Sequence, residues 1–87
     1  MSEFVIKTLF EYLIDLIEKN GLDFSFYAKN RMSFVQKFGK YIDSLQKRYK
    51  LENFNHEVII TDYLAGMTDA YAINSFKNIL TSGTSGF

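Results

Sequence analysis

The stretch "TDYLAGMTDAYAI", residues 61–73, decides how the second half of the chain folds, because it puts Gly66 inside a helical pattern. Glycine in a helix interior costs about 1 kcal/mol relative to alanine, so a packing or geometric reason should offset it. Thr68 is a favourable N-cap residue, and Asp69 suits the positive end of a new helix dipole. We therefore predict two helices that meet at a kink, with Gly66 allowing close backbone approach.

The composition indicates a single all-helical domain. The 87 residues include no Pro and only five Gly, and 47% of them are apolar, which is enough for the core of one small domain. We predict an all-α fold, a small helical bundle of three to four helices over residues 1–81, the last one kinked at Gly66–Thr68. The polar, Gly-rich residues 82–87 predict a flexible tail.

The first predicted helix is "EFVIKTLFEYLIDLIEKN", residues 3–20, with Ser2 as its N-cap and Gly21 at its C′ position. At 100° per residue its apolar side chains cover about 200° of the circumference. One neighbour cannot cover an arc of that width. We therefore expect this helix to be covered from two sides and to offer apolar surface to a partner.

The second predicted helix begins at Ser33, with Gln36 as a capping-box partner, and ends near Lys50. The aromatic stretch before it, residues 22–31, fits a packed loop or one helical turn. The apolar side chains of the helix share about 120° of its circumference. They are Phe34, Val35, Phe38, Tyr41, Ile42, Leu45 and Tyr49.

Charge is balanced overall but unevenly distributed. Residues 1–28 hold two basic and five acidic side chains, residues 29–50 hold seven basic side chains and one acidic, and residues 51–87 hold one basic and four acidic. The basic face of the second helix could contact phosphate or a partner, or could complement the acidic segments on either side. The side chains on that face are Lys37, Lys40, Lys47 and Arg48. Nucleic acid is the weaker expectation for a partner.

The third helical region begins at Asn55, which can cap it, and comprises residues 56–66 and 69–81. Apolar residues point nearly all round its first part, as in a buried segment. After Thr68 the apolar residues share about 120° of the circumference. They are Ala72, Ile73, Phe76, Ile79 and Leu80.

The run "DYLAGMTDAYAI" resembles the C-terminal signature of the HD-domain deoxynucleoside triphosphate triphosphohydrolases, the bacterial dGTPase-like family. The matching residues are Asp62, Tyr63, Leu64, Ala65, Gly66, Met67, Thr68, Asp69 and Tyr71. Ala70 stands where that family commonly has Arg, which puts in doubt any phosphate or partner contact made by that Arg. The upstream helices resemble the family's C-terminal helical region in kind.

The resemblance implies an enzyme that hydrolyses a dNTP to a deoxynucleoside and tripolyphosphate, with a divalent metal (Mg or Mn) held by a His…His-Asp…Asp set. This chain has one histidine, His56, and no His-Asp pair, so it cannot build that set. Asp62 and Asp69 are seven residues apart, but a kink between them breaks their alignment on one face. We expect no catalytic residues, no metal site and no cofactor in this chain, and no activity from it alone.

Two functions follow. The first is the C-terminal helical portion of a dGTPase-like enzyme, which supports the HD core, the nucleotide pocket and subunit contacts. The second is a stand-alone helical module for protein–protein interaction or dimerisation. For the first we expect the remainder of the HD enzyme and further copies of the chain as partners, a dNTP substrate only in the intact protein, and a cytoplasmic location without a membrane span. The residues expected to matter are those of the signature, Asp62, Tyr63, Gly66, Met67, Thr68, Asp69 and Tyr71.

Overall fold

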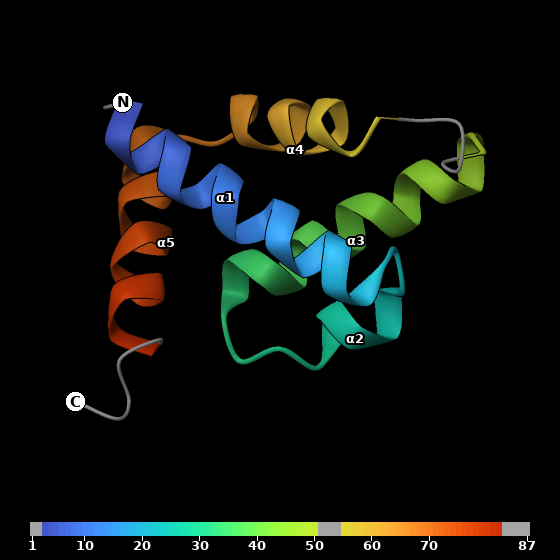
Figure 1. The fold of residues 1–87 in the computed structure, drawn as a ribbon, viewed down its shortest axis with the longest axis horizontal. Helices are drawn as coiled ribbons and strands as arrows, with labels where there is room; N and C mark the ends of the chain where they lie inside the picture. The colour runs from blue at the N-terminus through green and yellow to red at the C-terminus, as the bar shows by residue number, and fades with distance from the viewer. Residues whose placement is uncertain (1–2, 51–54, 83–87) are drawn as a thin grey trace.

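The computed structural model describes residues 3–50 and 55–82, and within these ranges every regular element is a helix (Figure 1). The helices are α1 Glu3–Asn20, α2 Phe24–Ala28, α3 Ser33–Arg48, α4 His56–Ala65 and α5 Asp69–Ser82. The all-α prediction is confirmed. In the described ranges the helices number five rather than three to four, because the aromatic stretch forms the short α2 and the expected kink is a complete break between α4 and α5.

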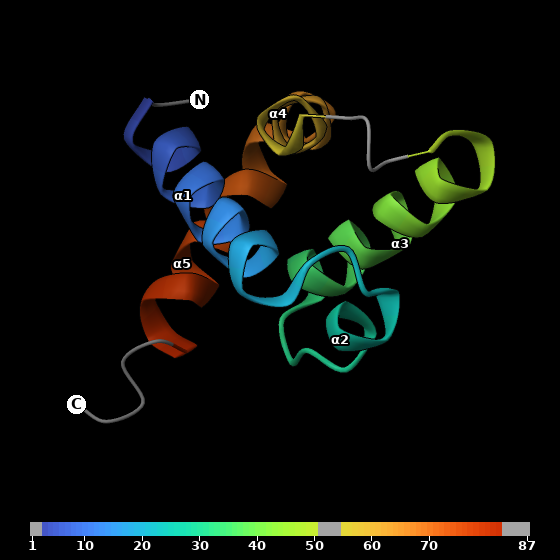
Figure 2. The same cartoon turned by 45° about the vertical axis from the view of Figure 1, so that its right-hand side comes forward.

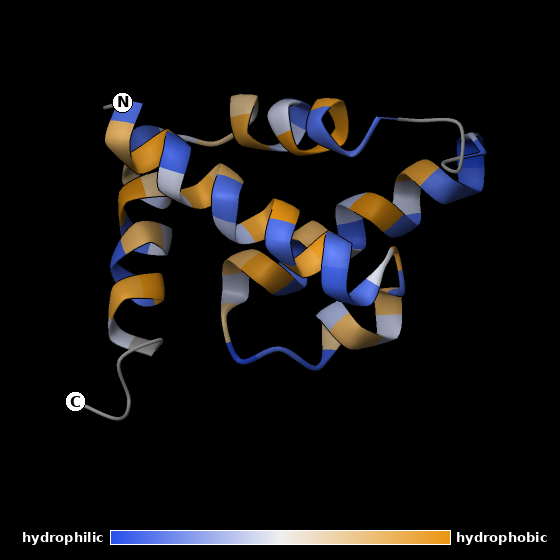
Figure 3. Ribbon diagram, viewed as in Figure 1, coloured by the Kyte–Doolittle hydropathy of each residue, from blue (hydrophilic) through white to orange (hydrophobic). Residues whose placement is uncertain are grey.

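Helix α1 is the centre of the arrangement (Figures 1 and 2). It packs against α4 and α5, whereas α2 packs against α3. Four α1 side chains spaced four residues apart form a fully or almost fully buried stripe, namely Val5, Leu9, Leu13 and Ile17. Hydrophobic and hydrophilic residues alternate along α1 and α3 with the helical period (Figure 3). The expectation that α1 is covered from two sides holds.

The end of α1 is set by Gly21, as expected. Its φ of 70° lies in the left-handed region, and its amide donates to the carbonyl of Ile17 at 2.7 Å. The chain then turns back, and the Tyr27 hydroxyl donates to the carbonyl of Gly21 at 2.6 Å. This bond ties α2 to the end of α1. The expected N-cap, Ser2, lies outside the described residues.

The start of α3 differs from the expected capping box. Ser33 is the first helical residue, and the N-cap position belongs to Met32, whose side chain cannot cap. Gln36 does reach back, but its amide donates to the carbonyl of Asn30 at 2.6 Å. The Asn30 side chain in turn accepts from the amide of Met32 at 2.9 Å. The capping box is therefore wrong, because Asn30 in the preceding loop supplies the polar contacts instead.

Helices α2 and α3 cross at Tyr27 and Gly39, and we call this contact the Gly39 crossing. Tyr27 is fully buried, and its ring stands perpendicular to that of Phe38 with centroids 5.6 Å apart. A Cβ atom added at Gly39 would lie 2.5 Å from Cβ of Tyr27. That separation is far inside van der Waals contact, so α2 can pack here only because residue 39 has no side chain.

Helix α4 begins where the sequence indicated, since the Asn55 side chain accepts from the amide of Glu57 at 2.7 Å. Helix α5, in contrast, buries a different face from the one that the sequence predicted. Ala72 and Ser75 are buried, whereas Ile73 and Leu80 are 41% and 50% exposed. The small residues let α5 lie close to α1, and the Ser75 hydroxyl is satisfied within α5 by donating to a carbonyl one turn earlier.

The expected tail, residues 82–87, lies outside the described residues apart from Ser82, which ends α5. The tail therefore stays a prediction. At the other end of the domain, Phe4 of α1 contacts Phe76 of α5 edge to face, with ring centroids 5.5 Å apart. This contact fixes the first turn of α1 against α5.

Candidate functional site

The link between α4 and α5 has well-defined capping at both ends. Gly66 follows the last turn of α4, and its amide donates to the carbonyl of Tyr63 at 3.2 Å. The Thr68 hydroxyl accepts from the amide of Tyr71 at 3.1 Å, so Thr68 caps α5 as the sequence predicted. The two helices are thus separate elements joined by three residues.

Gly66 does not have the role that the sequence suggested. Its φ is −86°, a value open to any residue. A Cβ atom added there would meet only carbonyl oxygens of the preceding turn, that of Tyr63 at 3.6 Å and that of Asp62 at 4.0 Å. Both are ordinary contacts, so the expected close backbone approach is wrong. The fold would accept a side chain at position 66.

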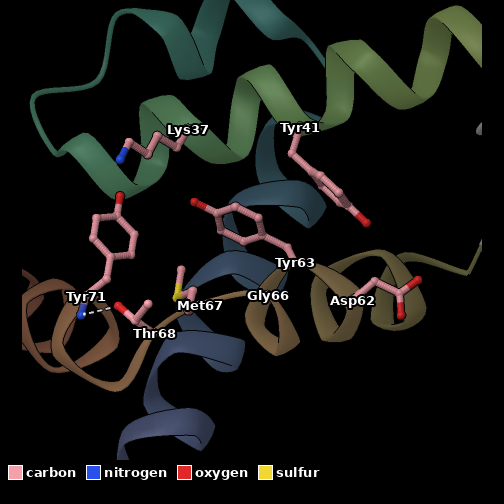
Figure 4. A pocket seen from close by; sticks show the side chains of 8 residues that line it. All are labelled: Lys37, Tyr41, Asp62, Tyr63, Gly66, Met67, Thr68 and Tyr71. Carbon is pink, nitrogen blue, oxygen red and sulfur yellow. Dashed lines mark hydrogen bonds between the residues drawn. The ribbon is translucent and has the colours of Figure 1, made fainter.

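The space beside Gly66 is an open groove of about 500 Å³, which we call the signature groove (Figure 4). Six of its eight lining residues belong to the signature, and α3 supplies the other two. The lining residues are Lys37, Tyr41, Asp62, Tyr63, Gly66, Met67, Thr68 and Tyr71. The groove therefore lies where α3 faces the end of α4 and the start of α5.

Tyr63 forms the middle of the groove. Its ring lies 5.1 Å from that of Phe38 and 5.5 Å from that of Tyr41, centroid to centroid. Its hydroxyl donates to the carbonyl of Phe34 at 2.8 Å, which ties α4 to α3. Burial, and then the neighbouring Tyr71, raise the pKa of the Tyr63 phenol. The Tyr63 phenol therefore stays neutral at ordinary pH and is not a proton-transfer group. Its side chain forms a fixed part of the groove lining.

Tyr71 and Lys37 form one end of the groove. The Lys37 ammonium lies 4.6 Å from the centroid of the Tyr71 ring, within the range of a cation–π contact. The Tyr71 hydroxyl oxygen is shielded from solvent and makes no hydrogen bond of good geometry among the described residues, although the Tyr63 phenol is close enough to interact with it. Leaving such a group unsatisfied costs about 1–3 kcal/mol. A contact made in a larger assembly can supply the hydrogen bond that the Tyr71 hydroxyl lacks.

Asp62 and Tyr41 form the opposite end, as Figure 4 shows. Asp62 is exposed, and Tyr41 is half-buried. Burial, and then the Asp62 carboxylate, raise the pKa of the Tyr41 phenol. The groove thus has an aromatic floor with a cation at one end and an anion at the other. Such a lining suits a flat or apolar group that carries opposite polarity at its two ends.

The family model of the phosphohydrolase-associated domain, a domain that accompanies HD phosphohydrolases, matches residues 2–78. The chain belongs to this family. The match takes in the whole signature groove and every helix except the last turn of α5. No curated protein and no solved structure gave a match to the chain.

The remaining predicted site residues of this phosphohydrolase-associated domain lie elsewhere. Asp69 is exposed in the first turn of α5, outside the groove lining. On the basic face of α3, Lys40 is exposed, Lys47 pairs with Asp43 at 3.3 Å, and Arg48 donates to a serine hydroxyl one turn earlier. Of the four cations, Lys37 is the one that the fold places in the groove.

One groove residue was assigned to the core alone by the sequence analysis. Tyr41 belongs to the apolar face of α3, yet its ring also lines the groove. It lies four residues after Lys37, so the two share one side of the helix. The spacing of four residues between Lys37 and Tyr41 was the signal that the sequence offered. It indicates a groove only once the structure shows that α3 faces the signature.

Across residues 3–50 and 55–82, no group of three or more metal-ligating side chains comes together. His56 is half-buried at the first position of α4. In the same described part of the chain, no helix combines the length and the apolar character that crossing a membrane requires.

Proposed function

We propose that this phosphohydrolase-associated domain is the C-terminal helical portion of a dGTPase-like dNTP triphosphohydrolase. It supports the HD catalytic core, the nucleotide pocket and the subunit contacts, and it does not catalyse hydrolysis alone. One observation carries the proposal: six signature residues surround one groove, next to a glycine that the fold does not need.

The freedom at Gly66 is the reason to assign a function to the groove. A glycine required by backbone strain or tight packing would be explained by folding alone. Here a Cβ atom would make only ordinary van der Waals contacts with the preceding turn, at a position that lines the groove. The absence of a side chain therefore keeps room for a group that comes from outside the domain, either a segment of the HD core or part of a nucleotide.

The chemistry of the lining supports such an occupant. A ring could lie on the tyrosines, since stacking on aromatic side chains contributes about 1–3 kcal/mol per base in nucleotide recognition. Lys37 would then face the anionic end of the occupant, and the Tyr71 hydroxyl would gain a partner after a small shift of its ring. Both contacts position a group. Neither transfers a proton or activates water.

The divalent metal implied by the family resemblance does not fit the residues of this chain. Its single histidine, His56, stands beside Glu57 at the start of α4, and the described side chains form no ligand cluster. The metal and the hydrolytic step belong to the HD core in this proposal. The domain acts on catalysis only through the shape and charge of the pocket.

The first test is to sequence the encoding locus upstream of the Met1 codon. An in-frame region with a His…His-Asp…Asp pattern is expected, and its full product should release tripolyphosphate from a dNTP in the presence of Mg²⁺ or Mn²⁺. The 87-residue chain should release none. A nearby upstream stop codon without such a region would leave the enzyme proposal without support.

A second test separates the groove from the rest of the domain. In the full product, Gly66→Ala should lower kcat/KM by roughly ten- to a hundredfold, because the added methyl group displaces whatever enters the groove. Lys37→Met should lower it less. The matched control is Asn78→Ala, an exposed change on α5 away from the groove. Equal kcat/KM for all three variants would show that the groove has no role in turnover.

The second candidate, a stand-alone interaction module, is favoured by apolar side chains left in solvent. Phe4 is 68% exposed, and Val58 and Leu80 are each about half exposed. Apolar side chains that gather into one exposed patch usually mark a contact with another protein. The same locus sequence decides between the two candidates, since a module would have no HD region in its reading frame.

A further inference from the structure

Asn20 is the only asparagine in the sequence that a glycine follows, and it is the last residue of α1. Such an asparagine is chemically labile, because glycine has no Cβ to shield its amide nitrogen from the asparagine side chain. A bond can form between the Gly21 nitrogen and Cγ of Asn20, while the bond from Cγ to Nδ2 breaks. The amide proton of Gly21 leaves with that nitrogen as ammonia. Water then opens the cyclic imide to aspartate or isoaspartate.

The folded chain holds both reacting groups away from this step. The Gly21 amide donates to the carbonyl of Ile17 at 2.7 Å. The Asn20 side-chain amide donates to the carbonyl of Leu16 at 3.2 Å, so the side chain lies back along α1 and away from the following peptide. Asn20 is exposed, so water can reach it. The reaction therefore waits for the last turn of α1 to open.

That turn is also where α2 and α3 are fastened to α1, and we call residues 20–22 the α1–α2 joint (Figure 1). The carbonyl of Gly21 accepts from the hydroxyl of the buried Tyr27 at 2.6 Å. The next carbonyl, that of Leu22, accepts from the side-chain amide of Gln46 in α3 at 3.4 Å. Opening the joint breaks bonds to both helices, so tertiary contacts reinforce the protection that the helix gives.

We propose that Asn20 is a deamidation site that the α1–α2 joint keeps unreactive, and that its isoaspartate product releases α2 from α1. Isoaspartate leads the main chain through Cβ and Cγ of residue 20, which adds a backbone atom just before Gly21. The Gly21 carbonyl then moves away from the Tyr27 hydroxyl. The free carboxylate also lies at the negative end of the α1 dipole, where it is unfavourable. This inference does not rest on the proposed enzymatic function.

The test follows the loss of the Asn20 side-chain amide in the 87-residue chain by peptide mass spectrometry at slightly alkaline pH. The folded chain should react at least about tenfold more slowly than the chain unfolded in urea, since reaction requires opening of the joint. In the folded state, Tyr27→Phe should react roughly fivefold faster than the wild type, because opening then breaks one hydrogen bond fewer.

Tyr63→Phe is the matched control for Tyr27→Phe. It removes a bond of the same kind between α4 and α3, away from the joint, and should leave the rate at Asn20 unchanged. Equal rates in the folded and unfolded chains would overturn the proposal. A Tyr27→Phe rate no higher than that of the control would overturn it as well.

A second measurement tests the isoaspartate product after its isolation. The amides of α2 should exchange with solvent about tenfold faster than in the wild type, whereas those of α5, which is fixed to the other end of α1, should not change. Asn20→Gln keeps a side-chain amide but cyclises far more slowly, so this variant should keep wild-type exchange after the same incubation. Wild-type exchange of α2 in the isoaspartate form would overturn the proposal, because the joint would then hold despite the longer main chain.

Discussion

Two glycines illustrate how differently the same residue can serve one small domain. At the Gly39 crossing an added Cβ atom would lie 2.5 Å from Cβ of Tyr27, so folding itself requires the glycine. At the link between α4 and α5 an added Cβ atom at Gly66 would meet nothing closer than 3.6 Å. The first glycine lies in a regular helix and has no motif around it, and the second stands in a recognisable signature. Packing explains the first glycine and does not explain the second.

The largest expected effect is at the crossing. Gly39→Ala should lower the free energy of unfolding by about 2 kcal/mol, since the added methyl group would force α2 away from α3. The contact atom is Cβ of Tyr27, at the base of the side chain, and cannot turn aside. Urea unfolding followed by circular dichroism measures the loss. An unchanged unfolding midpoint would show that the two helices can separate without cost.

The next effect is the response of the crossing to alkaline pH. Burial, and then the Asp23 carboxylate, raise the pKa of Tyr27 from its ordinary value of 10 to about 12. The folded state thus favours the neutral phenol, which donates to the carbonyl of Gly21. This contribution to stability is complete below pH 10 and is lost as the pH rises through 12.

Unfolding free energies measured between pH 10 and 12 should therefore fall more steeply for the wild type than for Tyr27→Phe. The phenolate absorbance of the wild type should also include one tyrosine that titrates near pH 12. Parallel stability curves for the two proteins would contradict the assignment of this loss to Tyr27. The substitution Phe26→Leu beside it is a control that removes no ionisable group.

A smaller effect is expected at the link. Thr68→Ala should cost about 1 kcal/mol of unfolding free energy, because the amide of Tyr71 loses its acceptor. Thr68→Ser keeps a hydroxyl group and should keep most of the stability. Thermal unfolding of the three proteins measures the difference. Equal losses for Ala and Ser would mean that the threonine methyl group, and not its oxygen, holds α5 in place.

The smallest effect, and opposite in sign, is at Gly66. Gly66→Ala should raise the free energy of unfolding by about 0.5 kcal/mol, since its φ suits alanine and the unfolded chain loses freedom. The same variant is expected to impair the signature groove. A Gly66→Ala variant that is more stable but has a lower kcat/KM in the full product would show that Gly66, unlike Gly39, is not needed for folding. If Gly66→Ala were instead less stable than the wild type, folding would need the glycine at position 66.

Local signals in the sequence were sufficient for most helix boundaries. The range 3–20 with Gly21 behind it, the Asn55 cap and the Thr68 cap are all present in the structure. Each depends on hydrogen bonds between residues at most four positions apart, so residue type and spacing determine it. The capping box at Ser33 failed because the Gln36 side chain donates to the backbone carbonyl of Asn30, six residues earlier, outside the range of these local signals.

The candidate site was predictable in part. The signature residues were named from the sequence, and the structure brings six of them to one groove. Tyr41 was missed as a groove residue, and the other basic residues of α3 do not reach the groove. The rotation of α5 was also missed, because the buried Ser75 is satisfied by its own helix and gives no apolar signal.

The sequence by itself determined that this chain is helical, where most of its helices begin and end, and which short run of residues resembles a family signature. These are properties of short segments, set by periodicity and capping. Only the tertiary structure decided which glycine the fold needs and that Lys37 and Tyr41 join the signature. It also left apolar residues of α1 such as Ile6 and Phe10 only partly buried. Those outcomes depend on contacts between residues far apart in the chain, whose geometry no local pattern records.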